Sequence, residues 1–204
     1  MLTSSTSGAD ILSLLAFAVS ATVTPGGATL LATASGARFG LRRSLPLLAG
    51  TSVGLAALVA LAGAGLGALL QAAPALQTAT RVAGSAYLLW LAWQIAWSGA
   101  PDIRQAEGSS PRGFPTGIAL LWLNPKGWTM ALAASATYAG LATSPASLAA
   151  LLGAVFGIAA ALSLLFWCAC GLLLARTLRT TAAWRPVNAV LGAALAASVV
   201  PIWL

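Results

Sequence analysis

Histidine is absent from this 204-residue sequence, and only three of its residues are acidic. The lack of histidine removes the commonest metal ligand and general base from consideration. No aspartate or glutamate lies within a long apolar run, so a membrane-embedded enzyme would lack both a nucleophile with its base and a metal cluster. These absences argue against an enzyme, and no cofactor or metal is expected.

Charge of either sign is scarce. Charged residues make up 6% of the chain, whereas a soluble domain carries about 25%. With a mean hydropathy of +0.92, such a chain cannot cover a globule with polar side chains, so we expect the lipid bilayer to surround it. A net charge of +7 would suggest nucleic acid for a soluble protein. Membrane proteins instead use Lys and Arg to set topology, and no nucleic-acid partner is expected.

Six apolar stretches reach the length of about 20 residues that a membrane helix needs. The first has no basic residue before it and continues past Pro25, so we expect a mature span rather than a signal peptide. The predicted fold is an all-α integral membrane protein with six transmembrane helices. The stretches are residues 11–34, 46–70, 75–97, 114–138, 146–175 and 186–204.

Basic residues gather in alternate connections between these stretches. The positive-inside rule makes the side that holds most of them cytoplasmic, which predicts that both termini lie outside. Eight of the ten basic residues fall in the first, third and fifth connections: Arg38, Arg42, Arg43, Arg104, Arg112, Arg176, Arg179 and Arg185.

A polar segment, residues 98–113, divides the chain into two parts, residues 1–97 and 114–204, with three apolar stretches in each. We expect this segment to be a cytoplasmic linker between two three-helix repeats. Because each part has an odd number of spans, the repeats must be inverted in the membrane.

Pairs of glycines four residues apart occur in both parts, Gly50 with Gly54 and Gly153 with Gly157. Such small-xxx-small pairs let helix backbones approach closely in lipid. The sequence leaves open whether they pack helices within one chain or between the copies of a homo-oligomer.

A proline lies near the middle of the first and fourth stretches, Pro25 in "VTPGGAT" and Pro125 in "WLNPKGW". Proline removes a backbone donor and clashes with the preceding turn, so both helices should be broken there. A packing kink would explain one such proline, because proline is common in membrane helices. Breaks at corresponding places in two inverted repeats instead indicate the binding site of a transporter.

Lys126 directly follows the second proline and is the only lysine in the chain. A lysine at the bilayer centre costs about 2.5–3.5 kcal/mol, which favours a functional role. It lies too far from either end of its stretch for the side chain to reach the interface. Since no acidic side chain lies in the apolar stretches, we expect the carboxylate of a substrate to be its counter-ion.

The predicted substrate site therefore lies between the two breaks. Glycines at the first break would let a ligand approach backbone N–H groups at a helix end, and Asn124 offers donors and an acceptor for an amino or amide group. Trp122 and Trp128 either wall this pocket or fill a helix interface. The candidate substrate-binding residues are Pro25, Gly26, Gly27, Asn124, Pro125 and Lys126.

Three segments together resemble the LysE/RhtB family of bacterial amino-acid exporters: "TPGGATLLATASGARFGLRRSLPLLAGTSVGL", "AGSAYLLWLAWQIAWSG" and "LWLNPKGW". The resemblance implies an inner-membrane protein that expels amino acids or their derivatives with the proton gradient, and "SAYLLWLAW" is most similar to exporters of cysteine and O-acetylserine. The family's Pro-Gly-Pro-Asn motif corresponds to Pro25, Gly26, Gly27 and Ala28, and its Asn-Pro-Lys motif to residues 124–126. Gly27 and Ala28 depart from the motif, which implies a different substrate preference.

We therefore expect a secondary active exporter of small amino acids or their derivatives, working by alternating access around a midplane site. The sequence leaves open a passive channel for small zwitterionic or anionic solutes, and a structural membrane protein without transport activity. Protons are the expected coupling ion. Because no carboxylate or histidine lies in a span to carry the proton, Lys126 itself is the candidate for the titrating group.

Overall fold

The computed structural model describes residues 8–66, 74–97, 113–178, 180–197 and 199–200, and all regular structure among them is helical. The predicted all-α fold is therefore confirmed for this part of the chain. The predicted linker, apart from Gly113, lies outside the described residues, as do Arg104, Arg112 and Arg179. The elements are α1 (Gly8–Val23), α2 (Gly27–Leu61), η1 (Ala62–Leu66), α4 (Pro74–Ala96), α6 (Phe114–Trp122), α7 (Pro125–Thr137), η2 (Ala139–Leu141), α8 (Pro145–Thr177) and α9 (Thr181–Ala197).

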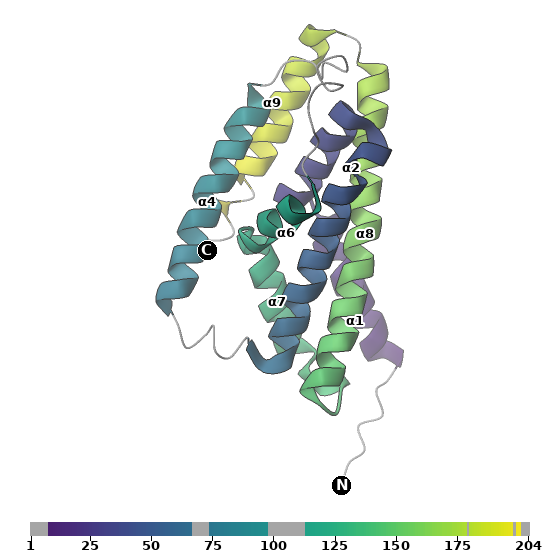
Figure 1. Ribbon diagram of the computed structural model, residues 1–204, viewed down its shortest axis with the longest axis vertical. Coiled ribbons are helices and arrows are strands. Elements are labelled where there is room, and N and C mark those ends of the chain that lie inside the picture. The colour runs from purple at the N-terminus through teal and green to yellow at the C-terminus, as the bar shows by residue number, and fades with distance from the viewer. Residues whose placement is uncertain (1–7, 67–73, 98–112, 179, 198, 201–204) are drawn as a thin grey trace.

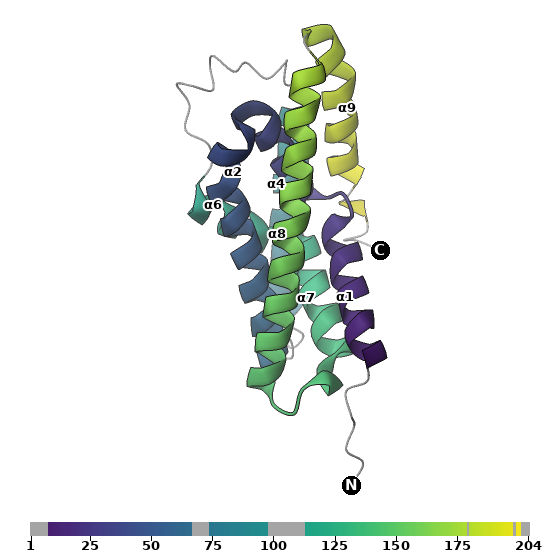
Figure 2. The same ribbon diagram turned by 90° about the vertical axis from the view of Figure 1, so that its right-hand side faces the viewer.

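The long element α2 contains a reversal of the chain. Gly40 has φ 74° and ψ 174°, a conformation that glycine adopts readily because it lacks a Cβ atom. Figures 1 and 2 show α2 rising to an arch and then running back along the molecule. The hydroxyls of Ser35 and Ser44, on either side of the arch, lie 2.7 Å apart. The stretch predicted at 11–34 thus comprises α1 and the first limb of α2, and the stretch at 46–70 begins in the second limb.

The reversal in α2 and the connection from α8 to α9 lie toward the same end of the molecule (Figure 1). Arg38, Arg42 and Arg43 flank the reversal, and Arg176 lies in the last turn of α8. This end, defined by the Gly40 reversal and the α8–α9 connection, is named the arginine-rich end below. The other end carries the start of α1 and the start of α8.

Helix α8 packs along α2, and two glycines allow their backbones to touch. A Cβ atom on Gly36 would clash with the backbone carbonyl of Cys168, and a Cβ atom on Gly171 would clash with that of Thr33. Any larger residue at either position would push the two helices apart. Cys168 is fully buried at this crossing and packs as a small apolar residue.

The small-xxx-small pairs also pack helices of this chain against one another. Gly50 and Gly54 in the second limb of α2 face α6, whereas Gly153 and Gly157 of α8 face Ala56 of α2. These close approaches explain both pairs without a second copy of the chain. A homo-oligomer stays a prediction.

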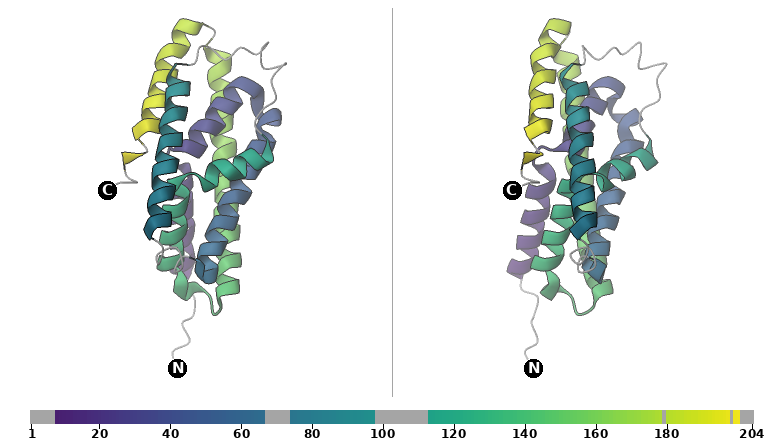
Figure 3. Two further views of the ribbon diagram at one scale, coloured as in Figure 1. Left: turned by 60° about the vertical axis from the view of Figure 1, so that its left-hand side comes forward. Right: turned by 90° about the vertical axis from the view of Figure 1, so that its left-hand side faces the viewer.

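Helices α4 and α9 lie side by side along one flank of the molecule (Figures 1 and 3). Their contact is built from leucines, with Leu88, Leu91 and Leu195 all buried in one apolar cluster. A Cβ atom on Gly192 would lie 2.7 Å from the carbonyl oxygen of Ala92, so this pair of helices also depends on a glycine.

Large apolar side chains lie on the outside of the molecule as well as in its core. Trp93 is 65% exposed and Ile158 is 63% exposed. Among the described residues, two helical segments are long and apolar enough to cross a membrane: Gly27–Gly65 and Pro145–Thr177 contain 18-residue windows with mean hydropathies of 2.0 and 2.4. The first of them contains the reversal at Gly40. An apolar exterior of this kind suits contact with lipid rather than water.

Candidate functional site

Helices end and restart at the two mid-span prolines. The first break, residues 24–26, separates α1 from α2, and the second break, residues 123–124, separates α6 from α7. The breaks expected at Pro25 and Pro125 are therefore present. Pro125 occupies the first position of α7, where its missing N–H group costs no helical hydrogen bond.

The helix end at the first break is held by side chains of α8. Ser163 Oγ donates to the carbonyl of Thr22 at 2.7 Å, and Trp167 Nε1 donates to the carbonyl of Val23 at 3.1 Å. The last carbonyl groups of any helix lack partners within it, and such groups must be satisfied in lipid. Two of them at the end of α1 are thus satisfied from another helix.

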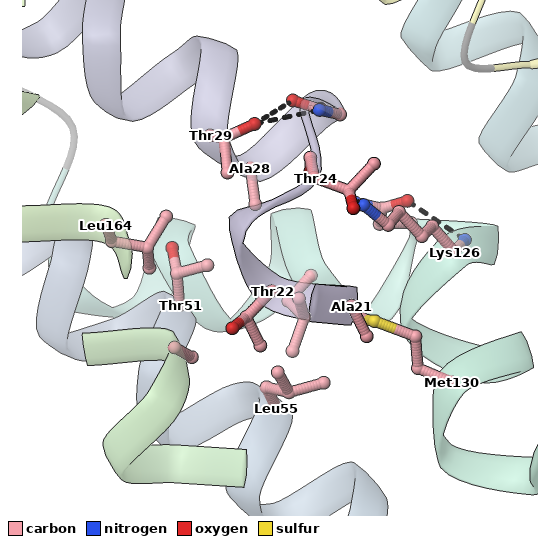
Figure 4. A pocket seen from close by; sticks show the side chains of 15 residues that line it. Ala21, Thr22, Thr24, Ala28, Thr29, Thr51, Leu55, Lys126, Met130 and Leu164 are labelled. Carbon is pink, nitrogen blue, oxygen red and sulfur yellow. Dashed lines mark hydrogen bonds between the residues drawn. The ribbon is translucent and has the colours of Figure 1, made fainter. Parts of the chain in front are cut away.

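Lys126 of α7 satisfies the next carbonyl along the chain. Its Nζ donates to the carbonyl of Thr24 at 2.8 Å, across 102 positions of sequence (Figure 4). Thr22, Val23 and Thr24 therefore each receive a donor from a neighbouring helix. Of the described residues, only Lys126 brings a charge to this end of α1.

The second break is closed mainly by residues next to it. Asn124 caps α7 by accepting the backbone N–H of Lys126 on its Oδ1 at 3.1 Å. Trp128 Nε1 donates to the carbonyl of Trp122 at 2.7 Å, and the two indoles pack edge to face at 6.1 Å between centroids. These tryptophans close the break and do not line the cavity described below.

The two breaks meet in space. A Cβ atom on Gly26 would lie 3.3 Å from Cδ of Lys126, and one on Gly27 would lie 3.5 Å from Nδ2 of Asn124. The lysine side chain therefore lies directly over the backbone of Gly26. Four of the six residues predicted to form the site come together here.

A cavity, named the Lys126 cavity, opens at this meeting point (Figure 4). Neither proline lines it: Pro25 is exposed, and Pro125 packs against Gly84. No sequence pattern indicated several of its lining residues, such as Thr51 and Met130, which reach the cavity only through the fold. Apart from Asn124 and Lys126, the lining residues have small or apolar side chains. The full lining is Ala21, Thr22, Thr24, Gly26, Gly27, Ala28, Thr29, Thr51, Leu55, Leu121, Asn124, Lys126, Met130, Ala160 and Leu164.

The polar groups of this cavity are mainly a positive charge and hydrogen-bond donors. Lys126 is the one charged residue among those described as lining it. Helix α2 begins at Gly27, and the N–H groups of a first helical turn have no acceptor within the helix. The N–H of Gly26 is already used, because it donates to Thr29 Oγ1 at 2.8 Å. The site thus offers an ammonium group and a positive helix end to an anionic group.

Asn124 adds a buried donor that lacks a protein acceptor. It is 5% exposed, and its Oδ1 is taken by the Lys126 N–H. Within the part of the chain that the structure describes, Nδ2 has no hydrogen-bond acceptor. Leaving a buried donor unpaired costs about 1–3 kcal/mol, so this amide favours a ligand that brings an acceptor oxygen. The sequence had left both donors and the acceptor of Asn124 open to a ligand.

The described residues are all helical in their regular structure, with long apolar helices and a lysine-bearing cavity between two broken helices, which is the architecture of a membrane transporter rather than an enzyme. The chain belongs to the LysE type translocator family, whose match covers residues 19–199. The family resemblance of the sequence is thereby confirmed.

Curated relatives carry a more specific description. The cysteine/O-acetylserine efflux protein of Klebsiella pneumoniae subsp. pneumoniae is 35% identical over 120 residues, which cover 57% of this chain and 58% of that protein. The cysteine/O-acetylserine efflux protein of Salmonella typhimurium is 35% identical over 104 residues, covering 51% and 52%. The chain thus matches only about half the length of these relatives. No solved structure matches it.

Proposed function

We propose that this chain is a secondary active exporter of small amino acids or their derivatives in the bacterial inner membrane. The observation that carries the proposal is the convergence of both breaks on one cavity, with Lys126 against Gly26 and Asn124 against Gly27. Broken helices that meet at a midplane site are typical of alternating-access transporters. Relatives that match this chain over about half their length are described as cysteine/O-acetylserine efflux proteins, which supports a substrate of this size.

Substrate binding then exchanges one partner of Lys126 for another. The ammonium group, which donates to the Thr24 carbonyl without substrate, turns to the carboxylate of the amino acid. Asn124 Nδ2 and the N–H groups at the start of α2 donate to the same group. Gly26 and Gly27 leave space for this approach, while Pro25 and Pro125 keep the two helices open.

The proposed topology has six crossings, with both termini outside. Residues 1–97 and 114–204 form the two inverted three-helix repeats, and residues 98–113 form the cytoplasmic linker between them. The gathering of arginines at the arginine-rich end supports a cytoplasmic location for that end. Rocking of one repeat against the other would expose the Lys126 cavity to each side in turn.

Protons are the proposed coupling ion, and Lys126 is their proposed carrier. A protonated Lys126 binds the carboxylate, and its deprotonation releases the substrate. No other titratable side chain lines the cavity among the described residues. Export against a gradient would then depend on the proton gradient across the membrane.

Efflux from proteoliposomes tests the proposal. The purified protein is reconstituted with a panel of labelled amino acids, with and without a proton gradient, beside Lys126→Ala and, as a control that removes a charge elsewhere, Arg176→Gln. We expect efflux of one group of small amino acids, lost in Lys126→Ala and kept in Arg176→Gln, with all three proteins inserted in equal amounts. Wild-type rates in Lys126→Ala would refute the site, and efflux of no amino acid would refute the function. Transport that only equilibrates the solute would identify a passive channel.

A further inference from the structure

A second, small cavity lies between α2, α4 and α6 and is named the α4 cavity. It adjoins the Lys126 cavity, because five residues line both cavities. Only one layer of backbone and side chains, named the shared layer, separates them. The shared layer consists of Gly27, Ala28, Thr51, Leu121 and Asn124.

Along α2, the two cavities extend in opposite directions from the shared layer. From the shared layer, the α4 cavity extends to Leu31 and Leu47, the positions of α2 that lie nearer to the Gly40 reversal and so to the arginine-rich end. The Lys126 cavity extends the other way, to Leu55 of α2 and Met130 of α7. Figure 3 shows α7 running from the second break away from the arginine-rich end. Substrate passing between the two ends would meet the cavities in turn.

We propose that the α4 cavity is the chamber through which the substrate reaches the Lys126 cavity from the arginine-rich side, and that the substrate crosses the shared layer. This inference rests on the proposed function. No charged residue lines the α4 cavity within the described chain, and its walls are mainly leucine and alanine. A charged side chain on the substrate would lack a partner there, so the chamber selects amino acids with small, uncharged side chains.

Two residues of the shared layer act on this passage in different ways. Asn124 lines both cavities, and its Nδ2 has no acceptor among the described residues, so it provides one hydrogen bond to the substrate's carboxylate throughout the crossing. Ala28 also lines both cavities, and its small side chain leaves space between them. A leucine at position 28 would fill the layer from the α2 side, whereas a serine would leave it almost unchanged in volume.

Thiol labelling tests the chamber without any need for transport. In a Cys168→Ala, Cys170→Ala background, Leu88→Cys places a thiol in the α4 cavity, and Leu89→Cys places one on the exposed face of the same helix. A membrane-impermeant methanethiosulfonate is added to vesicles from the cytoplasmic side. Leu88 is itself buried, so a thiol at this position reacts only when the chamber admits water. We expect it to react about tenfold faster than the thiol of Leu89→Cys, because only a solvated thiol ionises to the reactive thiolate. Equal rates would overturn the proposal.

Further variants separate this inference from the proposed function. Ala28→Cys lines both cavities and serves as the reporter if Leu88→Cys does not assemble. Fast labelling in a protein that exports no amino acid would refute the proposed function alone, and efflux without preferential labelling would refute the chamber alone. In proteoliposomes, Ala28→Leu should abolish efflux while Ala28→Ser keeps it. Full efflux by Ala28→Leu would show that the substrate does not cross the shared layer.

Discussion

Both helix breaks occur at a proline, but the free backbone groups at the two breaks find their hydrogen-bond partners in different parts of the chain. The second break is closed from within its own helix pair, by the side-chain cap of Asn124 and the bond from Trp128 to Trp122. The first break depends on other helices, since Ser163 and Trp167 of α8 and Lys126 of α7 hold its carbonyl groups.

This difference assigns the breaks different mechanical roles. A break that is closed locally keeps its shape when neighbouring helices move, so the second break holds Lys126 in a fixed place. A break that is held from outside rearranges when one of its partners leaves. Because Lys126 lies in the cavity and exchanges its partner in the proposed mechanism, the end of α1 is the part that substrate binding releases.

The largest effect is expected where α8 loses its position beside α2. Gly171→Ala adds a Cβ atom that clashes with the Thr33 carbonyl, and overpacking of this kind costs about 1–3 kcal/mol. Displacement of α8 also withdraws Ser163 and Trp167 from the first break. The melting temperature in detergent and the rate of efflux should both fall. Gly140→Ala, where nothing lies within 4 Å, should change neither; equal behaviour of the two variants would contradict the close helix contact.

A smaller effect is expected from Ser163→Ala, which leaves the buried Thr22 carbonyl without this donor. Loss of a donor to a buried group costs about 1–3 kcal/mol. The matched control is Ser135→Ala, because Ser135 donates at 3.0 Å to Leu132 within the regular helix α7. The melting temperature should fall more in Ser163→Ala than in Ser135→Ala. An equal fall would mean that the hydrogen bond from Ser163 to the Thr22 carbonyl does not specifically stabilise the first break.

At each break, one tryptophan donates a hydrogen bond to a carbonyl group, so a Trp→Phe substitution can remove the same kind of bond at both breaks. Trp167→Phe removes the donor to Val23, and Trp128→Phe removes the donor to Trp122. Each lost bond costs about 0.5–1.5 kcal/mol. We expect Trp167→Phe to alter the maximal rate of efflux, since the first break moves, and Trp128→Phe to change stability only. If Trp128→Phe altered the maximal rate by as much, the assignment of the moving part to the first break would be wrong.

Lys126→Arg should have the smallest effect on folding and a specific effect on pH dependence. In the wild type, substrate binding should be strongest where the ammonium is protonated and weaken as pH rises through its titration. Arginine stays protonated, so efflux by the variant should lose this pH dependence. A complete pH profile retained by Lys126→Arg would remove lysine as the proton carrier.

Features that are costly in lipid could be predicted from sequence. Pro25 and Pro125 remove hydrogen bonds that only an opening of the helix can replace, and Lys126 carries a charge that needs a partner. The alternation of arginines likewise predicted that the reversal near Gly40 and the α8–α9 connection would share one end of the molecule.

Features that depend on contacts between distant helices could not be predicted. Ser163 and Thr51 lie in ordinary apolar runs, and only the packing of α8 and α2 brings them to the breaks. The sequence left open whether Trp122 and Trp128 wall the site or fill a helix interface, because an indole beside a break suits either role. Neither tryptophan lines the Lys126 cavity; both line a separate small cavity beside Leu58, and Trp128 donates to the Trp122 carbonyl.

The most direct test of the partner exchange uses the fact that the chain has a single lysine. Protein labelled with ¹⁵N at lysine Nζ gives one side-chain signal in bilayers, that of Lys126. Addition of an exported amino acid should shift this signal, and the same amino acid without its carboxyl group should leave it unchanged. An unchanged signal with the amino acid, or equal shifts with both compounds, would contradict the proposal that Lys126 leaves the Thr24 carbonyl to bind the substrate's carboxylate.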